Sequence, residues 1–346
     1  MLIKINIIIK NISLIAEGPN YADGILLDNG ANFNIIEGNI IRCIPNNLTH
    51  SEGIITSYSA QNSNNQVINN YITNFYVGVY FHGKKNAPSQ DNSNVVRLNR
   101  IDKFYARAIL GEYQDSLTIR NNYITDSSHI GFNAMYLIYC NYFRIISNKI
   151  YMNNNSNSPL IYIRDCASDT LSPNLIVNNF ICQTAQASGT GCLSIGRASY
   201  TNIYYNSLKL TGGSTTGYCI SVGKGDYNIL NNVFSNTDDG YTIKIGSSTN
   251  VENSDFNDFY TTGANLAYWL LDVPDLPSLQ SVSNMDSSSV SVNPGFFSTS
   301  DLHVNNAYLN GAGTSITGIL YDIDGDLRDA LNPDIGADEF DLIYVD

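Results

Sequence analysis

The sequence predicts an all-β fold, a right-handed parallel β-helix, from its composition, a repeated phrase and the period of that phrase. Only 14% of the residues are charged, whereas 43% are hydrophobic. Ile, Val, Tyr, Thr and Asn abound, and the good helix formers Ala, Leu, Glu and Lys are scarce. The chain therefore favours strands, and it hydrates its surface with amides and hydroxyls.

The repeated phrase consists of alternating apolar residues that end in Asn-x-apolar. Its strong copies carry Asn70, Asn99, Asn122, Asn148, Asn179, Asn206 and Asn232, with steps of 29, 23, 26, 31, 27 and 26 residues. Weaker copies lie at Asn39 and at 254–256. A period of about 26 residues is too short for a propeller blade of about 40 and fits one coil of three short strands.

The alternation gives strands that turn one face inward. Asparagine suits the repeat for two reasons. It tolerates the left-handed backbone of a tight bend, so we expect the aligned asparagines to adopt it. Its amide can also hydrogen-bond to the coils above and below, so we expect a ladder.

A second phrase fixes the register of the later coils. It occurs at 191–196, 218–223 and 241–246, and each copy ends in glycine, where we expect positive φ. This register stacks Cys192 on Cys219, and we place both on the outer face. A disulfide and two free thiols both agree with that stacking.

The repeat stops after about Asp258. We therefore predict β-helix coils over 1–258 and an irregular C-terminal coil and cap segment over 259–346. Pro274 and Pro277 break the pattern, and a short helix is expected at Leu276–Ser283. The open end of a β-helix exposes unpaired strand edges, and a cap covers them.

The charge balance limits the partners of the chain. With 18 basic and 31 acidic residues, the net charge is −13, which repels nucleic acid and anionic lipid. The apolar start of the chain is interrupted by Lys4, Asn6 and Lys10, and is too polar to span a membrane. We expect the protein to be a monomer. A local basic patch would still allow it to bind an acidic sugar.

The last third of the chain carries phrases of a known family. They are Asp324-Gly325, Arg328, 333–337 and Glu339, preceded by 255–257, Asn265, Tyr268-Trp269, 293–296 and 301–303. In these phrases the chain resembles secreted bacterial parallel β-helix repeat proteins of the pectin-lyase-like superfamily. The resemblance implies export to an extracellular or cell-surface location. It does not fix the activity, because this fold hosts lyases, hydrolases, epimerases and non-enzymatic rods.

Polysaccharide is the expected partner, because a long parallel sheet offers a groove that spans several sugar units. A lyase on this scaffold needs Ca²⁺, Arg or Lys to neutralise a uronate carboxylate, and a base for the C5 proton. The candidate catalytic residues are His82, Lys84, Lys85, Arg107 and Arg164. The candidate substrate-binding residues are Tyr105, Glu112, Tyr113, Tyr136, Tyr162 and Asp165.

Aligning residues 79–81 with residues 161–163 puts His82 and Arg164 in one column, three coils and about 14 Å apart. One bound chain can touch both residues, although one reacting atom cannot. A solvated loop that carries Lys84 and Lys85 is the alternative interpretation. Residues 236–240 read Asn-Thr-Asp-Asp-Gly, which fuses an Asn-Thr-Asp and an Asp-Asp motif that galacturonan hydrolases carry on separate coils. A turn is a better interpretation of this run than a hydrolase active site. A lyase is therefore favoured over a glycoside hydrolase.

Asp322, Asp324 and Asp326 alternate like the oxygen ligands of a calcium loop. They either bind calcium, or cap turns and pair with Arg328; no other cofactor is indicated. Two functions follow from the sequence. The first is a secreted or cell-surface polysaccharide-interacting protein, with lyase activity on acidic glycans as one form. The second is a non-catalytic surface or adhesion rod, or a spacer module.

Overall fold

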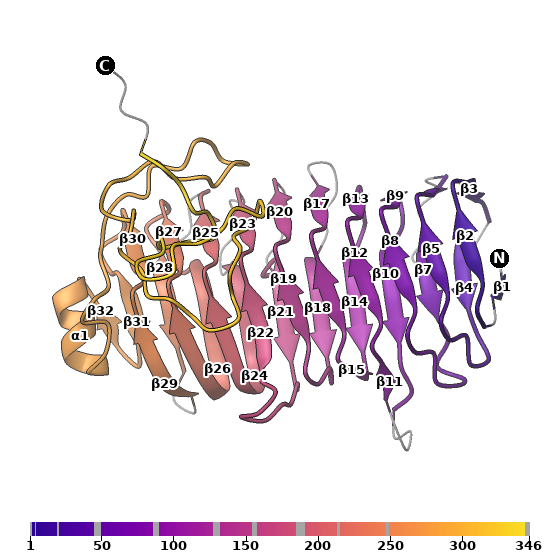
Figure 1. Cartoon of the computed structure of the whole chain (residues 1–346), viewed down its shortest axis with the longest axis horizontal. Coiled ribbons are helices and arrows are strands. Elements are labelled where there is room, and N and C mark those ends of the chain that lie inside the picture. The colour runs from indigo at the N-terminus through magenta and orange to yellow at the C-terminus, as the bar shows by residue number, and fades with distance from the viewer. Residues whose placement is uncertain are drawn as a thin grey trace.

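The computed structural model describes residues 2–3, 5–18, 21–44, 50–85, 90–126, 132–153, 158–184, 191–212, 215–246 and 249–342. The chain winds into a rod of stacked coils, with the N-terminus at one end and the helix α1 (Leu276–Ser283) at the other (Figure 1). Each regular coil contributes one strand to each of three parallel stacks. The predicted parallel β-helix is confirmed.

The first stack pairs strands in register from the N-terminal end to β31. It comprises β1 (Leu2–Ile3), β4 (Ile25–Leu27), β7 (Glu52–Thr56), β10 (Val77–His82), β14 (Arg107–Glu112), β18 (Asn133–Ile138), β21 (Ile161–Arg164), the first halves of β24 (Gly191–Tyr204) and β26 (Tyr218–Leu230), β28 (Tyr241–Ile245) and β31 (Ala267–Trp269).

The second stack follows around the coil and includes the second halves of β24 and β26. Its other members are β2 (Ile8–Lys10), β5 (Ile35–Glu37), β8 (Gln66–Ile68), β12 (Val95–Arg97), β16 (Thr118–Arg120), β19 (Arg144–Ile146), β22 (Asn174–Val177) and β29 (Thr249–Asp255).

The third stack is a separate ten-stranded sheet. It contains β3 (Ser13–Ala16), β6 (Ile40–Cys43), β9 (Tyr71–Thr73), β13 (Arg100–Asp102), β17 (Tyr123–Asp126), β20 (Lys149–Met152), β23 (Phe180–Gln183), β25 (Ser207–Leu210), β27 (Val233–Asn236) and β30 (Asp258–Thr261). Outside the stacks, β11 (Asp91–Asn92) pairs with β15 (Gln114–Asp115), and β32 (Asp272–Val273) is antiparallel to β31.

The repeated asparagines form the predicted ladder between the second and third stacks. Each buried amide oxygen accepts hydrogen bonds from the backbone N–H and the side-chain amide of the asparagine one coil earlier, the latter at 2.9–3.0 Å. The column consists of Asn39, Asn70, Asn99, Asn122, Asn148, Asn179, Asn206, Asn232 and Asn257. A buried amide that is satisfied in every coil fixes the register.

The left-handed backbone lies one residue earlier than we expected. The residues at positive φ are Asn11, Gly38, Asn69, Leu98, Asn121, Ser147, Asn178, Tyr205, Asn231 and Phe256. The bend is therefore made by the residue before each ladder asparagine, and in the first coil by Asn11 before Ile12; only Gly38 among these residues is a glycine. Contacts across the coils hold residues such as Leu98 and Tyr205 in a conformation that they disfavour alone.

The glycine prediction was also wrong, because Gly196, Gly223 and Gly246 do not adopt positive φ. A Cβ at Gly223 would collide with the carbonyl oxygen of Gly196, so Gly223 is required by close approach of two coils. Cys192 and Cys219 do stack in register, but both are fully buried and free rather than outward-facing. Strict alternation does not hold at the start of β24, where Gly191, Cys192 and Leu193 are all buried.

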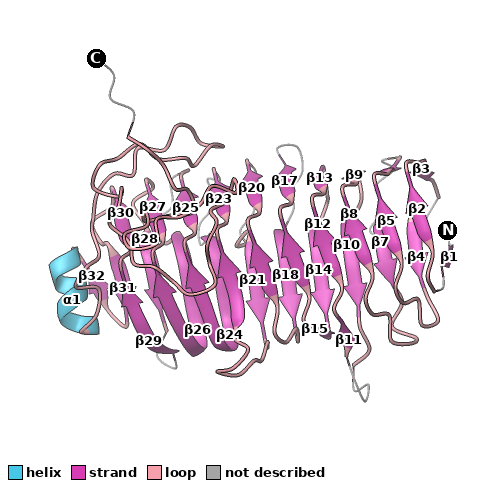
Figure 2. Ribbon diagram, in the orientation of Figure 1, coloured by secondary structure: helices cyan, strands magenta, loops and turns pink. Residues whose placement is uncertain are grey.

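The predicted cap does not cover the open end of the rod: residues 296–342 pack on the outside of the third stack in the later coils (Figure 1), and we keep the name cap for this segment. Leu302, Ile323 and Ala337 cover Phe180, while another group of apolar residues covers Val233. The predicted helix Leu276–Ser283 is confirmed as α1, with Asp275 accepting a hydrogen bond from the backbone of Ser278 as its N-cap. Figure 2 shows α1 at the end of the rod. No helix in the described residues is long and apolar enough to cross a membrane.

Candidate functional site

The outer surface of the first stack gathers aromatic and basic side chains, and we call it the tyrosine–arginine face. Its members are Tyr80, His82, Arg107, Glu112, Tyr136, Tyr162, Arg164, Arg197, Lys224 and Lys244. Strand alternation places Tyr80, His82, Tyr136, Tyr162 and Arg164 there, because their neighbours in the same strands point into the core. Arg107 stands at the start of its strand, and Arg197 and Lys224 follow the alternating part of theirs. Parallel register then aligns them along the rod.

At the N-terminal part of the face, three side chains form one cluster. The Tyr80 hydroxyl donates to Glu112 Oε2 at 2.6 Å, and His82 Nε2 lies 3.5 Å from the same oxygen. The Tyr80 and His82 rings stack with centroids 4.7 Å apart. Burial lowers the pKa of His82 against the opposing effect of Glu112, while burial and Glu112 raise the pKa of Tyr80. At neutral pH, Tyr80 therefore keeps its proton and Glu112 is its acceptor.

The middle of the face is a stacked pair of tyrosines, Tyr136 and Tyr162, which we call the aromatic step; the Arg107 guanidinium group lies beside it. Tyr136 and Tyr162 are partners in neighbouring strands, with ring centroids 5.2 Å apart and planes inclined by 7°. The Arg107 guanidinium carbon lies 4.9 Å from the centroid of the Tyr136 ring. These groups form a flat surface with a cation at its edge, which suits a sugar ring with polar substituents.

The next coils carry a group of cations. Asp165 is in the left-handed region, and its side chain, 6% exposed, pairs with Arg164 Nε at 3.1 Å and with Arg197. Beside this pair, a hollow of about 260 Å³ is lined by Tyr162, Arg164, Asp165, Gly196, Arg197 and Lys224. Three cationic side chains and one carboxylate make the hollow electropositive.

The face ends at Lys244, whose ammonium group sits among three tyrosine rings. The distances from Nζ to the ring centroids are 5.5 Å for Tyr218, 5.7 Å for Tyr241 and 5.8 Å for Tyr268. This lysine is therefore already engaged with aromatic faces.

The structure brings together seven of the eleven residues proposed for catalysis and substrate binding. His82, Arg107, Glu112, Tyr136, Tyr162, Arg164 and Asp165 lie on or beside this face. His82 and Arg164 share a column as expected, with Glu112 and Ile138 between them.

The other four lie outside the aligned columns. Tyr105 precedes β14, and Tyr113 stacks on Tyr139 at 4.8 Å in the bend after it. Lys84 and Lys85 are exposed in the loop after β10, and 86–89 of that loop lie outside the described residues.

The three aspartates proposed as calcium ligands do not converge. Asp322 Oδ1 accepts from the backbone N–H groups of Asp324, Gly325 and Asp326, and Oδ2 accepts from that of Glu339. Asp322 therefore caps a turn, and Arg328 pairs with Glu339 and not with one of these aspartates. The run 236–240 is likewise a turn, with Asp239 at positive φ.

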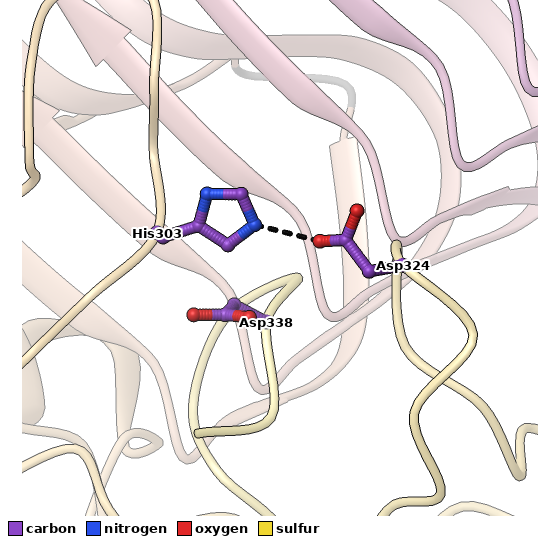
Figure 3. Close-up of side chains that lie close together, drawn as sticks. All are labelled: His303, Asp324 and Asp338. Atoms are coloured by element: carbon purple, nitrogen blue, oxygen red, sulfur yellow. Dashed lines mark hydrogen bonds and ion pairs between the residues drawn. The ribbon is translucent and has the colours of Figure 1, made fainter. Parts of the chain in front are cut away.

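One group of metal-binding side chains occurs within the described ranges, and Figure 3 shows it: His303, Asp324 and Asp338. One ligand atom from each lies within 4.8 Å of the others. His303 Nε2 is 2.6 Å from Asp324, and Nδ1 contacts Asp301. Burial disfavours the imidazolium, yet hydrogen bonds to Asp324 and Asp301 raise the pKa of His303.

This His303 cluster was missed because its members come from separate loops of the cap. No spacing in the sequence links His303 to Asp338, and only the packing of the cap brings them together. Lys149 of β20 also reaches Asp324 Oδ1, at 2.8 Å. The cluster thus lies where the cap meets the third stack.

The family of the chain is shown by comparison with known proteins. A comparison with curated proteins finds no match. Residues 4–212, more than half of the chain, match the family model NosD, described as periplasmic copper-binding protein. This chain therefore belongs to the NosD family.

Proposed function

We propose that this protein is an exported β-helix protein that binds an extended polysaccharide along the tyrosine–arginine face. The carrying observation is the stacked pair Tyr136–Tyr162, with Arg107 at one side and Arg164 at the other. The family description, periplasmic, supports a place outside the cytoplasm, where glycans are available.

The face suits a chain molecule better than a small one. Adjacent coils repeat at about 4.8 Å, so aromatic and polar groups recur along the rod on the scale of one sugar unit. Tyrosine rings offer apolar surface to the sugar and a hydroxyl to its polar groups. The cationic part of this surface is open, since the Arg164 and Arg197 side chains are more than half exposed.

Binding is better supported than lyase chemistry. A lyase needs a base that can reach the C5 proton. The raised pKa of Tyr80 makes it a poor base, and His82 Nε2 faces Glu112. The Glu112 carboxylate would also repel a uronate at that point. We therefore place the sugar contacts at Tyr136 and Tyr162, and treat cleavage as an outcome to be measured.

The test measures binding of polygalacturonate, alginate, chondroitin sulfate and xylan by calorimetry, with Tyr162→Ala as the variant. Tyr123→Ala is the matched control, because Tyr123 is a 41% exposed tyrosine on the third stack. We expect Tyr162→Ala to weaken binding about tenfold or more and Tyr123→Ala to leave it unchanged. Equal affinity for both variants, or no binding of any glycan, would refute the proposal. Appearance of unsaturated uronate absorbance would instead establish a lyase.

Copper(II) binding at the His303 cluster is the second candidate, and the family description favours it. Imidazole nitrogen and carboxylate oxygen are suitable ligands for copper(II). Asp301 beside Nδ1 matches the way in which a carboxylate orients a metal-binding imidazole. His303 Nε2, Asp324 and Asp338 would hold the ion, and Lys149 would have to leave Asp324.

The described part of the chain offers no comparable set of soft ligands for copper(I). All six cysteines are buried and free, and burial raises the pKa of the Cys182 thiol to about 12. Such thiols resist becoming the thiolates that bind metal. Met135 and Met152 are likewise fully buried in the core.

The metal test titrates copper(II), zinc and calcium into the protein and measures the heat of binding by calorimetry. For copper, the electron paramagnetic resonance spectrum is recorded as well. His303→Gln should abolish copper binding, whereas His50→Gln, at an exposed histidine, should retain it. Binding should weaken below the raised pKa of His303, because the metal must displace a proton. An unchanged copper affinity in His303→Gln would exclude this cluster, and calcium binding that survives it would point to other acids.

A further inference from the structure

We infer that the hollow beside Tyr162 is an anion subsite, which binds one carboxylate or sulfate substituent of the polysaccharide. This inference rests on the proposed function and names its substrate class: a polyanionic glycan. The subsite consists of Arg164, Arg197, Lys224 and the Tyr162 hydroxyl, all of which line the same hollow.

The charges in the hollow do not cancel. Arg164, Arg197 and Lys224 supply three positive charges, and Asp165 supplies one negative charge. The Asp165 side chain is 6% exposed, so it lies behind the cations, whereas the two arginine side chains are 52% and 57% exposed. A local excess of positive charge on a chain with a net charge of −13 is a specific feature of this surface.

The donors are held but not used up. Asp165 engages the Nε of Arg164, which orients the guanidinium group and leaves its terminal nitrogens for a ligand. Lys224 is paired in register with Arg197 and makes no ion pair with any described residue. A carboxylate or sulfate oxygen would therefore gain charge-assisted hydrogen bonds that no protein group already supplies.

Glycine keeps the hollow open. Gly196 follows Arg164 in the outward column, and a Cβ there would lie 3.5 Å from the Tyr162 hydroxyl. A larger side chain at Gly196 would fill the space between Tyr162 and the cations. The hollow of about 260 Å³ is several times the roughly 30 Å³ share of one water molecule in the liquid. One anionic group therefore fits.

Tyr162 connects the subsite to the aromatic step. Its ring stacks on Tyr136, while its side chain also lines the hollow. A sugar that lies on this ring would place an acidic substituent within reach of the cations. Lys244, the other cation farther along the face, is surrounded by aromatic rings instead. The selectivity for acid should therefore reside at Lys224 and the two arginines.

The experiment compares polygalacturonate with the same polymer after reduction of its carboxyl groups, and adds chondroitin sulfate as a sulfate-bearing arm. Lys224→Gln is the main variant because it breaks no described ion pair; Arg197→Gln is the second, and Arg100→Gln on the third stack is the control. We expect wild type to bind the acidic polymer about tenfold more tightly than the reduced one. Lys224→Gln and Arg197→Gln should lose that preference, whereas Arg100→Gln should keep it.

The outcomes separate this inference from the proposed function. If wild type binds both forms of the polymer equally, the anion subsite is refuted while polysaccharide binding stands. If no glycan binds, the proposed function fails and the inference with it. A preference for polygalacturonate over its reduced form would identify the substituent as a carboxylate. Because chondroitin sulfate carries carboxylates as well, only a loss of its binding on desulfation would identify the substituent as a sulfate. If both variants still prefer the acidic polymer over the reduced one, the acidic group binds elsewhere on the protein and the proposed subsite is refuted.

Discussion

The interior and the exterior of the same coils use one register for different purposes. Inside, the same side chain recurs from Asn39 to Asn257, and each amide is saturated by its neighbours. Outside, the column that passes through Tyr136 and Tyr162 continues as Ser194, so its residue type changes between coils. Repetition therefore marks architecture, and departure from repetition marks the surface available to a ligand.

The largest expected effect comes from breaking the interior column at Asn148. Asn148→Ala removes the acceptor for the backbone and side chain of Asn122 and leaves the Ile119 and Ile146 carbonyls without this donor. Buried groups that lose their partners cost about 1–3 kcal/mol each, so we expect the free energy of unfolding to fall by roughly 4 kcal/mol. Chemical denaturation measures it.

The matched control is Asn228→Ala, which removes a half-buried amide pair with Asn202 on the second stack. Its cost should stay below about 1 kcal/mol because water can replace the partner. If both variants lose the same stability, the amide column has no special role.

Arg328 sharpens the comparison, because it comes from the cap and yet behaves as an interior residue. It is 5% exposed, lies 4.0 Å over the Tyr205 ring, and donates to Asn178, Gly336 and Glu339. Arg328→Ala would leave Glu339 without its cation, so we expect a loss of about 3 kcal/mol. Limited proteolysis should detect detachment of the cap before the coils unfold.

Arg100→Ala is the control for Arg328, because the Arg100 side chain is 61% exposed. It should change the free energy of unfolding by less than about 1 kcal/mol. A cap that resists protease in Arg328→Ala as in wild type would contradict the proposed anchor.

Asp91 places an acid in a second interior column of amides. It is 1% exposed and accepts a hydrogen bond from the Asn62 backbone, and burial raises its pKa to about 6. A carboxyl whose pKa is raised by folding stabilises the fold below its unfolded value, and this contribution is lost as pH rises through about 6.

Asp91→Asn replaces the acid by the amide of its neighbours and should remove this loss. The variant should match wild type near pH 4 and exceed its unfolding free energy by about 2–3 kcal/mol near pH 8. The stability difference between the two proteins against pH isolates Asp91 from Glu52, whose pKa burial raises to about 8. A difference that does not vary with pH would reject this assignment.

The interior could be predicted from the sequence because the same buried residue types are required in every coil and therefore recur at a regular spacing. The spacing of the ladder asparagines, the short strands and the helix after Asp275 follow from local patterns. The shift of positive φ to the residue before each asparagine did not, because two adjacent polar residues such as Asn69 and Asn70 suit a bend equally well. Cys192 was misplaced because strict alternation fails at the start of β24, where three consecutive residues are buried.

The exterior was only partly accessible. Register put His82 and Arg164 in one column from the sequence, since they follow matching phrases. Arg197 and Lys224 were missed because they lie after the repeated phrase, where strands continue around a corner. His303 was missed because its partners are assembled by the irregular packing of the cap. Residues that gain their meaning from tertiary contacts leave no periodic signal.

The smallest expected effect on stability comes from Tyr162→Ser, and it sharpens the distinction between the two surfaces. The register places Ser194 and Ser221 at the same outward position in the next two coils, so the fold already accepts serine there. The loss of one exposed stacking contact with Tyr136 should cost less than about 1 kcal/mol. Glycan affinity should nevertheless fall about tenfold, because the ring that would receive the sugar is gone. A stability loss as large as that of Asn148→Ala would mean that this face stabilises the fold as the interior does, and would contradict the distinction between a structural interior and a ligand-binding exterior.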